Sequence, residues 1–332
     1  MPKSAFPSSS FRVLLFILLL ASAFLPACRK SAAPVFDAAA HRQEIQKWQA
    51  TRLERLTEPD GWLSLVGLFW LHEGENKFGS DPKNPVVLPE GKAPAVTGSF
   101  WLKDGRVQLT TRARIPISLS TPSTGDIEVL GRLIAVPIER SRNLYLTDDT
   151  QDNGPTRLEI DSLIINVVKR GDRIGIRVKD PKSLTRQEFK GLEYFPIDPK
   201  WRIEARFEPY QPPKIIQIDN VLNMTDDETS PGALAFEVNG KTYRIDPILE
   251  QGETDYFVMI ADETTGGETY GAGRYLYVSP PDASGKVIID FNKAYSPPCA
   301  FTGFATCPLP PQQNHLPLRI EAGEKKYAGP VH

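Results

Sequence analysis

The stretch LEIDSLIINVVKRGDRIGIRV, residues 158–178, decides the fold class of this chain of 332 residues. It holds three β-strand candidates in close succession, at 158–161, 163–169 and 173–178, and these are rich in Val and Ile. Short runs of this composition at regular spacing are typical of all-β domains. The stretch therefore predicts a strand-rich chain, and a β-sandwich is the natural container for it.

The same pattern extends in both directions from this stretch. Turn signals such as Asp104-Gly105 and Asn153-Gly154 separate further runs, and Asn239-Gly240 predicts a two-residue type I′ hairpin. The 30 Pro and 24 Gly residues agree with many short elements joined by turns. The other predicted strands are 84–88, 96–102, 107–111, 115–119, 132–138, 144–146, 203–207, 215–219, 233–238, 241–246, 256–261, 270–278 and 287–291.

One helix is predicted before the strands, over residues 37–56. Ile45, Trp48, Leu53 and Leu56 form an apolar stripe on it, and His41 is placed on its exposed surface. The Pro59-Asp60-Gly61 turn signal ends the helix. Residues 62–71 are apolar at nearly every position, so we expect one or two core strands there. The predicted fold is mainly β: an N-terminal amphipathic helix, a β-sandwich, and a second β domain packed against it.

The N-terminus carries an export signal. Lys3 and Arg12 precede an apolar run at 13–25, which is too short to span a bilayer comfortably. Its ending, Leu25-Pro26-Ala27-Cys28, resembles the bacterial lipoprotein signal, which implies lipidation of Cys28 and a membrane partner reached through the lipid. The lack of Asp after Cys28 resembles lipoproteins sorted to the outer membrane, facing the periplasm. Ordinary secretion, with Cys28 incidental, is the alternative.

The charge and the remaining cysteines restrict the possible functions. A net charge of −2 offers no basic surface for nucleic acid. With Cys28 lipidated, Cys299 and Cys307 are an even pair, and in an oxidising envelope they predict a disulfide; free thiols or a metal site are the alternatives. The spacing of Cys299, Cys307 and His315 does not match structural zinc. No metal or cofactor is predicted, and no phosphate-binding loop or nucleophile elbow is present.

Several motifs resemble a bacterial and archaeal family known as domain of unknown function 1684. The resemblance covers about residues 45–325, and its name implies no activity. The motifs are GWLSLVGLFWL (61–71), GEN (74–76), FGSD (78–81), RVKDP (177–181), FKGL (189–192), PG (231–232), DETTGGETY (262–270), RYL (274–276), DFN (290–292) and the segment from YSPPC (295–299) to ATCPLP (305–310).

The first β region also resembles forkhead-associated sandwiches. The resemblance rests on Gly79-Ser80-Asp81, Gly98 and Gly171-Asp172-Arg173-Ile174, in that order. Those domains read phosphothreonine through an Arg and a His that have no counterparts beside Gly79 and Gly98. The predicted organisation is a signal peptide at 1–27, a tether at 28–37, the helix and sandwich at 38–185, and a second β domain at 186–332, with a boundary in the Pro-containing segment 180–201.

The candidate site lies in the second β domain. Alternation places Asp290 and Asn292 on one face, and Arg274 lies across from them if its strand is a neighbour. We expect a ligand-binding site in which Arg274 takes an anionic group. The structural alternative is an Arg held by carboxylates at a sheet corner, and Arg177 with Asp180 allows the same two interpretations. The candidate ligand-binding residues are Arg274, Asn292, Thr265 and Tyr270, and the candidate catalytic residues are Asp262 and Asp290.

Three functional hypotheses follow from this site. The first is a binding or accessory module of the cell envelope for a small polar ligand or an envelope component. The second is a hydrolase that uses paired carboxylates in the same cleft. The third is a structural scaffold. The sequence leaves open whether there is any catalysis.

Overall fold

The computed structural model describes residues 36–111, 118–120, 144–250 and 252–331. The predicted signal peptide with Cys28, most of the tether, and the predicted strand at 132–138 lie outside these ranges. None of the helices within them is both long and apolar enough to cross a membrane. Residues 39–332 form one compact unit, and the division predicted at residue 185 stays a prediction.

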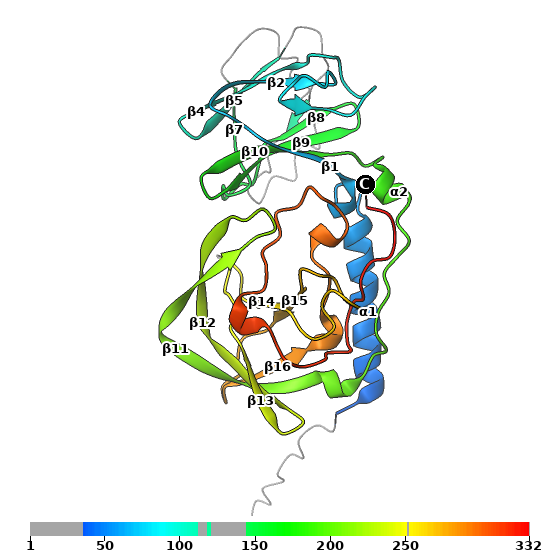
Figure 1. Cartoon of the computed structure of the whole chain (residues 1–332), viewed down its shortest axis with the longest axis vertical. Coiled ribbons are helices and arrows are strands. Elements are labelled where there is room, and N and C mark those ends of the chain that lie inside the picture. The colour runs from blue at the N-terminus through cyan, green and yellow to red at the C-terminus, as the bar shows by residue number, and fades with distance from the viewer. Residues whose placement is uncertain (1–35, 112–117, 121–143, 251, 332) are drawn as a thin grey trace, which may run out of the picture. The chain divides into compact units, whose positions relative to one another are not determined.

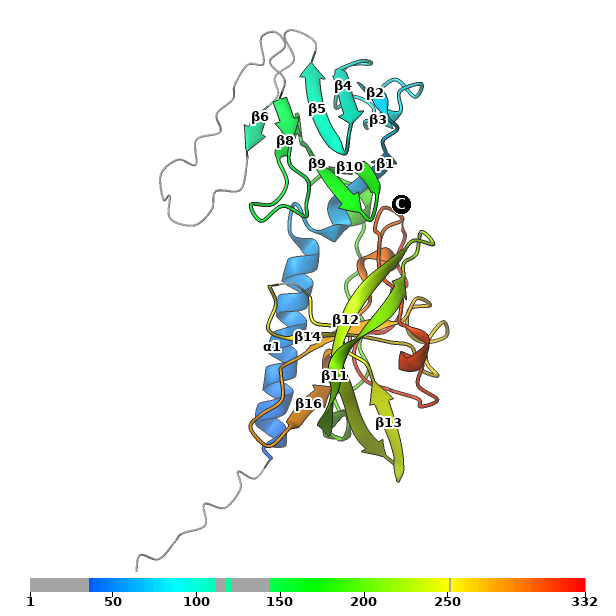
Figure 2. The ribbon, with the colours of Figure 1, turned by 90° about the vertical axis from the view of Figure 1, so that its left-hand side faces the viewer.

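Helix α1 (Ala38–Thr57) agrees with the predicted helix to within a residue at each end. It runs beside strands of the C-terminal half of the chain (Figures 1 and 2). Ile45 and Leu56 are buried as expected, but Leu53 is 40% exposed and His41 is buried. The buried face instead contains positions 41, 45, 48, 52 and 56, whose spacing of three or four residues follows the helical period.

The apolar run at 62–71 is not a core strand along its length. Its first residues form a 3₁₀ turn (η1, Trp62–Ser64), and strand β1 (Leu65–Trp70) follows. Strand β1 is an edge strand of its sheet, whose strand order is β1-β10-β9-β8-β6. An edge strand has a neighbouring strand on one side only. Neighbouring residues therefore cover β1 incompletely: Leu65 is buried, whereas residues 68–70 are half exposed.

Within the described residues, two five-stranded sheets build the first β region, and both contribute to one hydrophobic core. The second sheet has the order β3-β2-β4-β5-β7. The predicted β-sandwich is thus present. Strand β2, sequence GENKFG, was missed because its Gly and charged residues give a weak β signal. The strands besides β1 are β2 (Gly74–Gly79), β3 (Val86–Val87), β4 (Gly98–Lys103), β5 (Arg106–Thr111), β6 (Ser118–Ser120), β7 (Leu144–Leu146), β8 (Arg157–Ile160), β9 (Leu163–Arg170) and β10 (Arg173–Lys179).

The second β region contains a four-stranded sheet, β13-β12-β11-β16, and a β14-β15 pair. Strand β11 was predicted as two strands because prolines interrupt its sequence. The structure keeps it continuous, with a register shift between Pro209 and Lys214 that takes up the irregularity. The strands are β11 (Arg202–Asp219), β12 (Thr225–Val238), β13 (Lys241–Ile245), β14 (Tyr256–Ile260), β15 (Arg274–Val278) and β16 (Lys286–Asp290).

The Asn239-Gly240 hairpin is confirmed. The φ angles of these two residues are 53° and 73°, and Val238 pairs with Lys241 across the turn. Positive φ at both central positions defines the type I′ turn, which matches the twist of the flanking strands. Short helical elements complete this half of the chain: α2 (Leu184–Gln187), η2 (Pro199–Trp201), η3 (Phe291–Lys293), η4 (Pro298–Ala300) and η5 (Gln312–Asn314).

Candidate functional site

Arg274, the first residue of β15, is completely buried. Its Nη2 lies 3.1 Å from Asp262 Oδ1, and the guanidinium also donates to the backbone carbonyls of Ile320 and Ala322. Burial lowers the pKa of Arg274, and the charge of Asp262 opposes that shift. This geometry matches the alternative interpretation of the sequence, in which carboxylate and backbone hold the Arg in place.

Asp262 is the centre of a dense hydrogen-bond cluster. It accepts from Thr264 Oγ1 at 2.9 Å, from Thr265 Oγ1 at 3.3 Å and from the Ile320 amide at 2.8 Å. Thr265 therefore belongs to the turn that Asp262 organises. Together, Asp262 and Arg274 hold both the amide and the carbonyl of Ile320, and so fix the position of the segment that contains it.

Asp290 and Asn292 form a second cluster, separate from Arg274 in its bonding. Strand β16 pairs with β11, and β15 pairs with β14, so the condition for placing Arg274 across from Asp290 is not met. Asn292 Nδ2 donates to Asp290 Oδ1 at 2.9 Å, but Asn292 lies in the 3₁₀ turn η3, which Asp290 caps, so strand alternation does not extend to it. Its Oδ1 accepts from the amide of Asp198.

The partner of Asp290 is His41, whose Nε2 lies 2.6 Å from Asp290 Oδ2. His41 is only 4% exposed, so its assignment to the helix surface is wrong. The two residues are 249 positions apart. The sequence does contain an indication that His41 is buried: it precedes Ile45 by four residues and therefore lies on the same face of the helix as Ile45 and Leu56.

A third buried polar pair, missed by the sequence analysis, joins the same helix to the C-terminal segment. Arg52 Nε lies 3.3 Å from Oε2 of Glu324, which is fully buried. Burial raises the pKa of Glu324, and the charge of Arg52 opposes the rise. Among the described residues, neither Glu324 Oε1 nor the buried Tyr194 hydroxyl has a hydrogen-bond partner.

Tyr270 contacts the segment 295–310, which contains Cys299 and Cys307 and which we call the Pro-rich loop. Tyr270 Oη donates to the Cys299 carbonyl at 2.9 Å. The predicted disulfide is not formed: Cys299 and Cys307 are both free in the structure. The Cys307 sulfur instead accepts a hydrogen bond from the Cys299 amide at 3.1 Å.

Arg177 and Asp180 were also candidates for either a ligand site or a structural ion pair. Both are buried, but in the described part of the chain they bind to different neighbours and not to each other. Asp180 accepts from Ser162 Oγ and from the Lys182 amide, each at 2.9 Å. Arg177 lies over the Trp62 ring, 5.4 Å from its centroid. Its Nε and Nη2 have no hydrogen-bond partner among the described residues.

An open cavity of about 660 Å³ lies in the second β region, and we call it the 201–321 groove. Its apolar residues are Trp201, Ile203, Val238, Pro317 and Leu318, and its polar residues are Lys200, Glu237, Asn239, Glu263, Arg319 and Glu321. None of the predicted site residues lines it. Its wall at 317–321 is, however, the segment that Asp262 and Arg274 hold at Ile320.

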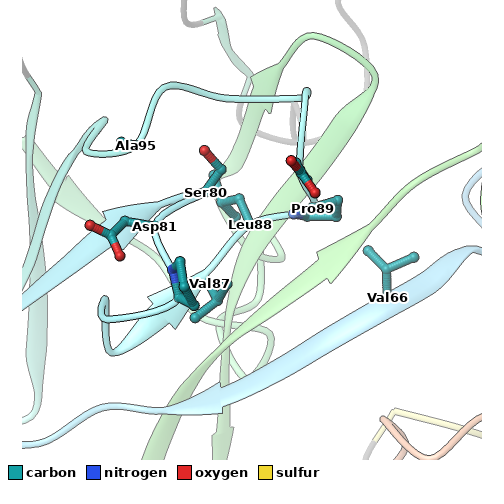
Figure 3. A pocket seen from close by; sticks show the side chains of 9 residues that line it. Val66, Ser80, Asp81, Val87, Leu88, Pro89 and Ala95 are labelled. Carbon is teal, nitrogen blue, oxygen red and sulfur yellow. The ribbon is translucent and has the colours of Figure 1, made fainter.

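A second open cavity, of about 630 Å³, lies in the first β region (Figure 3). Val66, Val87 and Leu88 contribute apolar surface, and Asp81 and Glu90 are its only charged lining residues. No metal-binding group of three or more His, Cys, Asp or Glu residues occurs in the ranges that the structure covers.

Comparison with known proteins places most of these features in one family. The sequence model of a family described as "Protein of unknown function (DUF1684)" matches residues 187–325. The chain belongs to this family. The DUF1684 match includes the 201–321 groove, the Asp262 and Asp290 clusters and both cysteines of the Pro-rich loop, but it does not include helix α1.

The solved structures with similar sequence include a solution NMR structure of an uncharacterized protein from Haloarcula marismortui. The identity is 33%, over 42% of this chain and 78% of that chain, with a TM-score of 0.36. Curated proteins gave no significant match. The comparisons therefore supply a family and no activity.

Proposed function

We propose that this DUF1684 protein is a lipid-anchored binding module of the cell envelope, and that a small polar ligand binds in the 201–321 groove. The observation that carries the proposal is the lining of that groove. Apolar side chains and charged side chains from separate segments of the chain meet there, a combination typical of small-molecule sites. The predicted anchor at Cys28 supplies the attachment to the membrane.

The charges in the groove favour a ligand with a protonated amine. Arg319 is bound by Glu268 and Glu321, and Lys200 lies 3.0 Å from Asp198. Within the described part of the chain, Glu237 and Glu263 form no ion pair. The unneutralised charges of the groove are therefore negative, and a cationic group beside an apolar surface complements them.

In this proposal Arg274 and Asp262 act as positioning residues. Asp262 accepts the amide of Ile320, and Arg274 binds the carbonyls of Ile320 and Ala322. Leu318, Arg319 and Glu321 extend from the segment held in this way, and they line the groove. Because buried side chains hold the backbone of this segment, its groove-lining side chains are already in position before a ligand binds. This preorganisation lowers the entropic cost of binding.

The geometry gives the paired-carboxylate hydrolase less support. A general acid or base must come within hydrogen-bond reach of the substrate. Asp262 is 8% exposed and bound to Arg274, and Asp290 is 8% exposed and bound to His41. Neither lines the 201–321 groove. Both carboxylates are thus better suited to holding the fold than to contacting a substrate.

Thermal-shift screening tests the binding proposal. The protein is screened against amino sugars, amino acids, short peptides, peptidoglycan fragments and organic acids, and each compound that raises the melting temperature is repeated with Glu237→Gln and Glu263→Gln. A ligand at about one hundred times its Kd stabilises by roughly 2.7 kcal/mol, so the shift is readable.

We expect amine-bearing compounds among the hits, with weaker binding to both groove variants. The matched control is Glu204→Gln, because Glu204 is also exposed but pairs with Lys286 outside the groove. A hit that binds all three variants equally well would refute the groove as the site. Retention of the Cys28→Ser variant in the membrane fraction would refute the lipid anchor.

A further inference from the structure

The two cysteines of the Pro-rich loop lie together in an unequal pair. The amide of Cys299 donates to the sulfur of Cys307, which is 4% exposed. Cys299 is partly exposed. Cys299 can therefore be reached from solution more readily than Cys307. Redox-active dithiols have this division between an accessible attacking sulfur and a resolving sulfur.

The electrostatics of the pair follow the same division. A hydrogen bond from the Cys307 thiol lowers the pKa of Cys299, although burial opposes this. The same bond raises the pKa of Cys307, and burial adds to the rise. Cys299 is thus the sulfur that ionises first, and the thiolate is the reactive form of cysteine.

A buried cation acts on the second sulfur. Arg177, on β10, is 7% exposed, and its Nε and Nη2 have no hydrogen-bond partner among the described residues. Burial lowers the pKa of Arg177 to about 10, a value at which the side chain stays charged at neutral pH. Its charge favours ionisation of Cys307. In the part of the chain that the structure describes, no carboxylate forms a salt bridge with Arg177, although the charges of Arg170 and Asp149 also act on it, so its positive charge can stabilise a thiolate at Cys307.

We propose that Cys299 and Cys307 form a redox-active dithiol that carries out thiol–disulfide exchange with a disulfide substrate. The Cys299 thiolate attacks one sulfur of the substrate, forming a mixed disulfide and releasing the other sulfur as a thiolate. Cys307 then loses its proton to that thiolate and attacks Cys299 Sγ, which releases the second substrate thiol. The protein is oxidised by two electrons to the Cys299–Cys307 disulfide, and the substrate is reduced to two thiols.

The test uses the full chain in a Cys28→Ser background, in which Cys299 and Cys307 are the only cysteines. The reduced native protein is treated with iodoacetamide at pH 7, and the labelled peptides are followed by mass spectrometry. We expect Cys299 to be alkylated at least about tenfold faster than Cys307. Equal rates, or no labelling until the protein is unfolded, would overturn the assignment of Cys299.

Oxidised glutathione is the probe for exchange. The Cys307→Ser variant should accumulate one glutathionyl group on Cys299, whereas the parent protein should pass to the internal disulfide and retain none. Reduced glutathione should then restore the dithiol in the folded protein. A disulfide that resists native reduction would show a structural cross-link and refute the proposal, as would a parent protein that keeps the glutathionyl group.

Arg177→Met tests the positioning role of the buried cation. It should slow the release of the glutathionyl group about tenfold and move the pH midpoint of that step upward, because the Cys307 thiolate loses a favourable charge. The matched control is Arg173→Met, an exposed arginine on the same strand that lies over Trp70. Equal pH midpoints in both variants would remove Arg177 from the mechanism.

Discussion

Replacing Asp262 with Asn should be among the most destabilising conservative changes in this protein. The side chains of Asp262 and Arg274 are both 0% exposed, and Asp262 also accepts hydrogen bonds from Thr264, Thr265 and the Ile320 amide. Asp262→Asn leaves the guanidinium buried without its salt-bridge partner. Breaking a buried pair from one side costs about 3–5 kcal/mol, mostly from the charge left behind.

Urea unfolding at pH 7 measures this cost. With an m-value of about 3 kcal/mol per molar urea, the loss lowers the unfolding midpoint by roughly 1–1.7 M. Arg274→Met should cost a similar amount. The double variant should cost clearly less than the sum of the two, because it leaves no unpaired buried charge.

The matched control is an exposed ion pair of similar length. Lys286 Nζ lies 2.9 Å from Glu204 Oε1, and both side chains are more than half exposed. Lys286→Met should therefore leave the midpoint unchanged within error. An Asp262→Asn protein within about 1 kcal/mol of wild type, or single costs that add fully in the double variant, would show that the pair does not stabilise the fold.

Three further predictions follow from other contacts. Glu324→Gln should change the pH dependence of unfolding. The raised pKa of Glu324 means that the folded state holds the proton more tightly than the unfolded state does, so wild type loses stability as the pH rises above the ordinary value of 4.5. The variant should therefore gain stability relative to wild type as the pH of urea titrations is raised from 4.5, and a constant difference would contradict this. Asp290→Asn weakens the 2.6 Å contact with His41 and should lower the free energy of unfolding by about 2–3 kcal/mol. Amide hydrogen exchange in α1, measured by mass spectrometry, should become faster. Unchanged exchange in α1 would contradict the role of this contact in holding the helix. Gly240→Ala, at a φ of 73°, should cost about 1 kcal/mol in the same urea assay, whereas Gly267→Ala, where φ is not positive, should cost less.

The sequence predicted features that depend on neighbours along the chain. The helical period fixed α1 to within a residue at each end, and the Asn-Gly dipeptide gave the β12–β13 hairpin its turn type. The predictions were wrong where residues distant in the sequence determine the local structure. Prolines in β11 suggested a break, but pairing with β12 on both sides of a register shift keeps the strand continuous.

The candidate site shows the same limit more sharply. Polar residues of the correct segments were found, but their partners were not, because pairing such as that of His41 with Asp290 spans 249 positions. The type of a residue shows that its side chain can form hydrogen bonds or ion pairs. It does not show whether the partner is a ligand or another residue of the protein. In the structure, the Nη atoms of Arg274 and the carboxylate of Asp290 bond to other parts of the protein, and only the structure could show those partners.

These internal pairs explain how the C-terminal segment holds its place without regular strands. Between residues 310 and 325 the described structure contains only the 3₁₀ turn η5 and isolated bridges. Asn314 is fully buried and bonds to both backbone groups of Asp246, Arg274 and Asp262 hold Ile320, and Arg52 holds Glu324. These side-chain bonds add to isolated backbone bonds of the segment, such as those from the Leu316 amide to the Ala261 carbonyl and from the Glu324 amide to the Ala294 carbonyl. Because this segment forms one wall of the 201–321 groove, the groove depends on buried charges that lie outside it, and a change at Glu324 or Asp262 should reach the groove through the backbone.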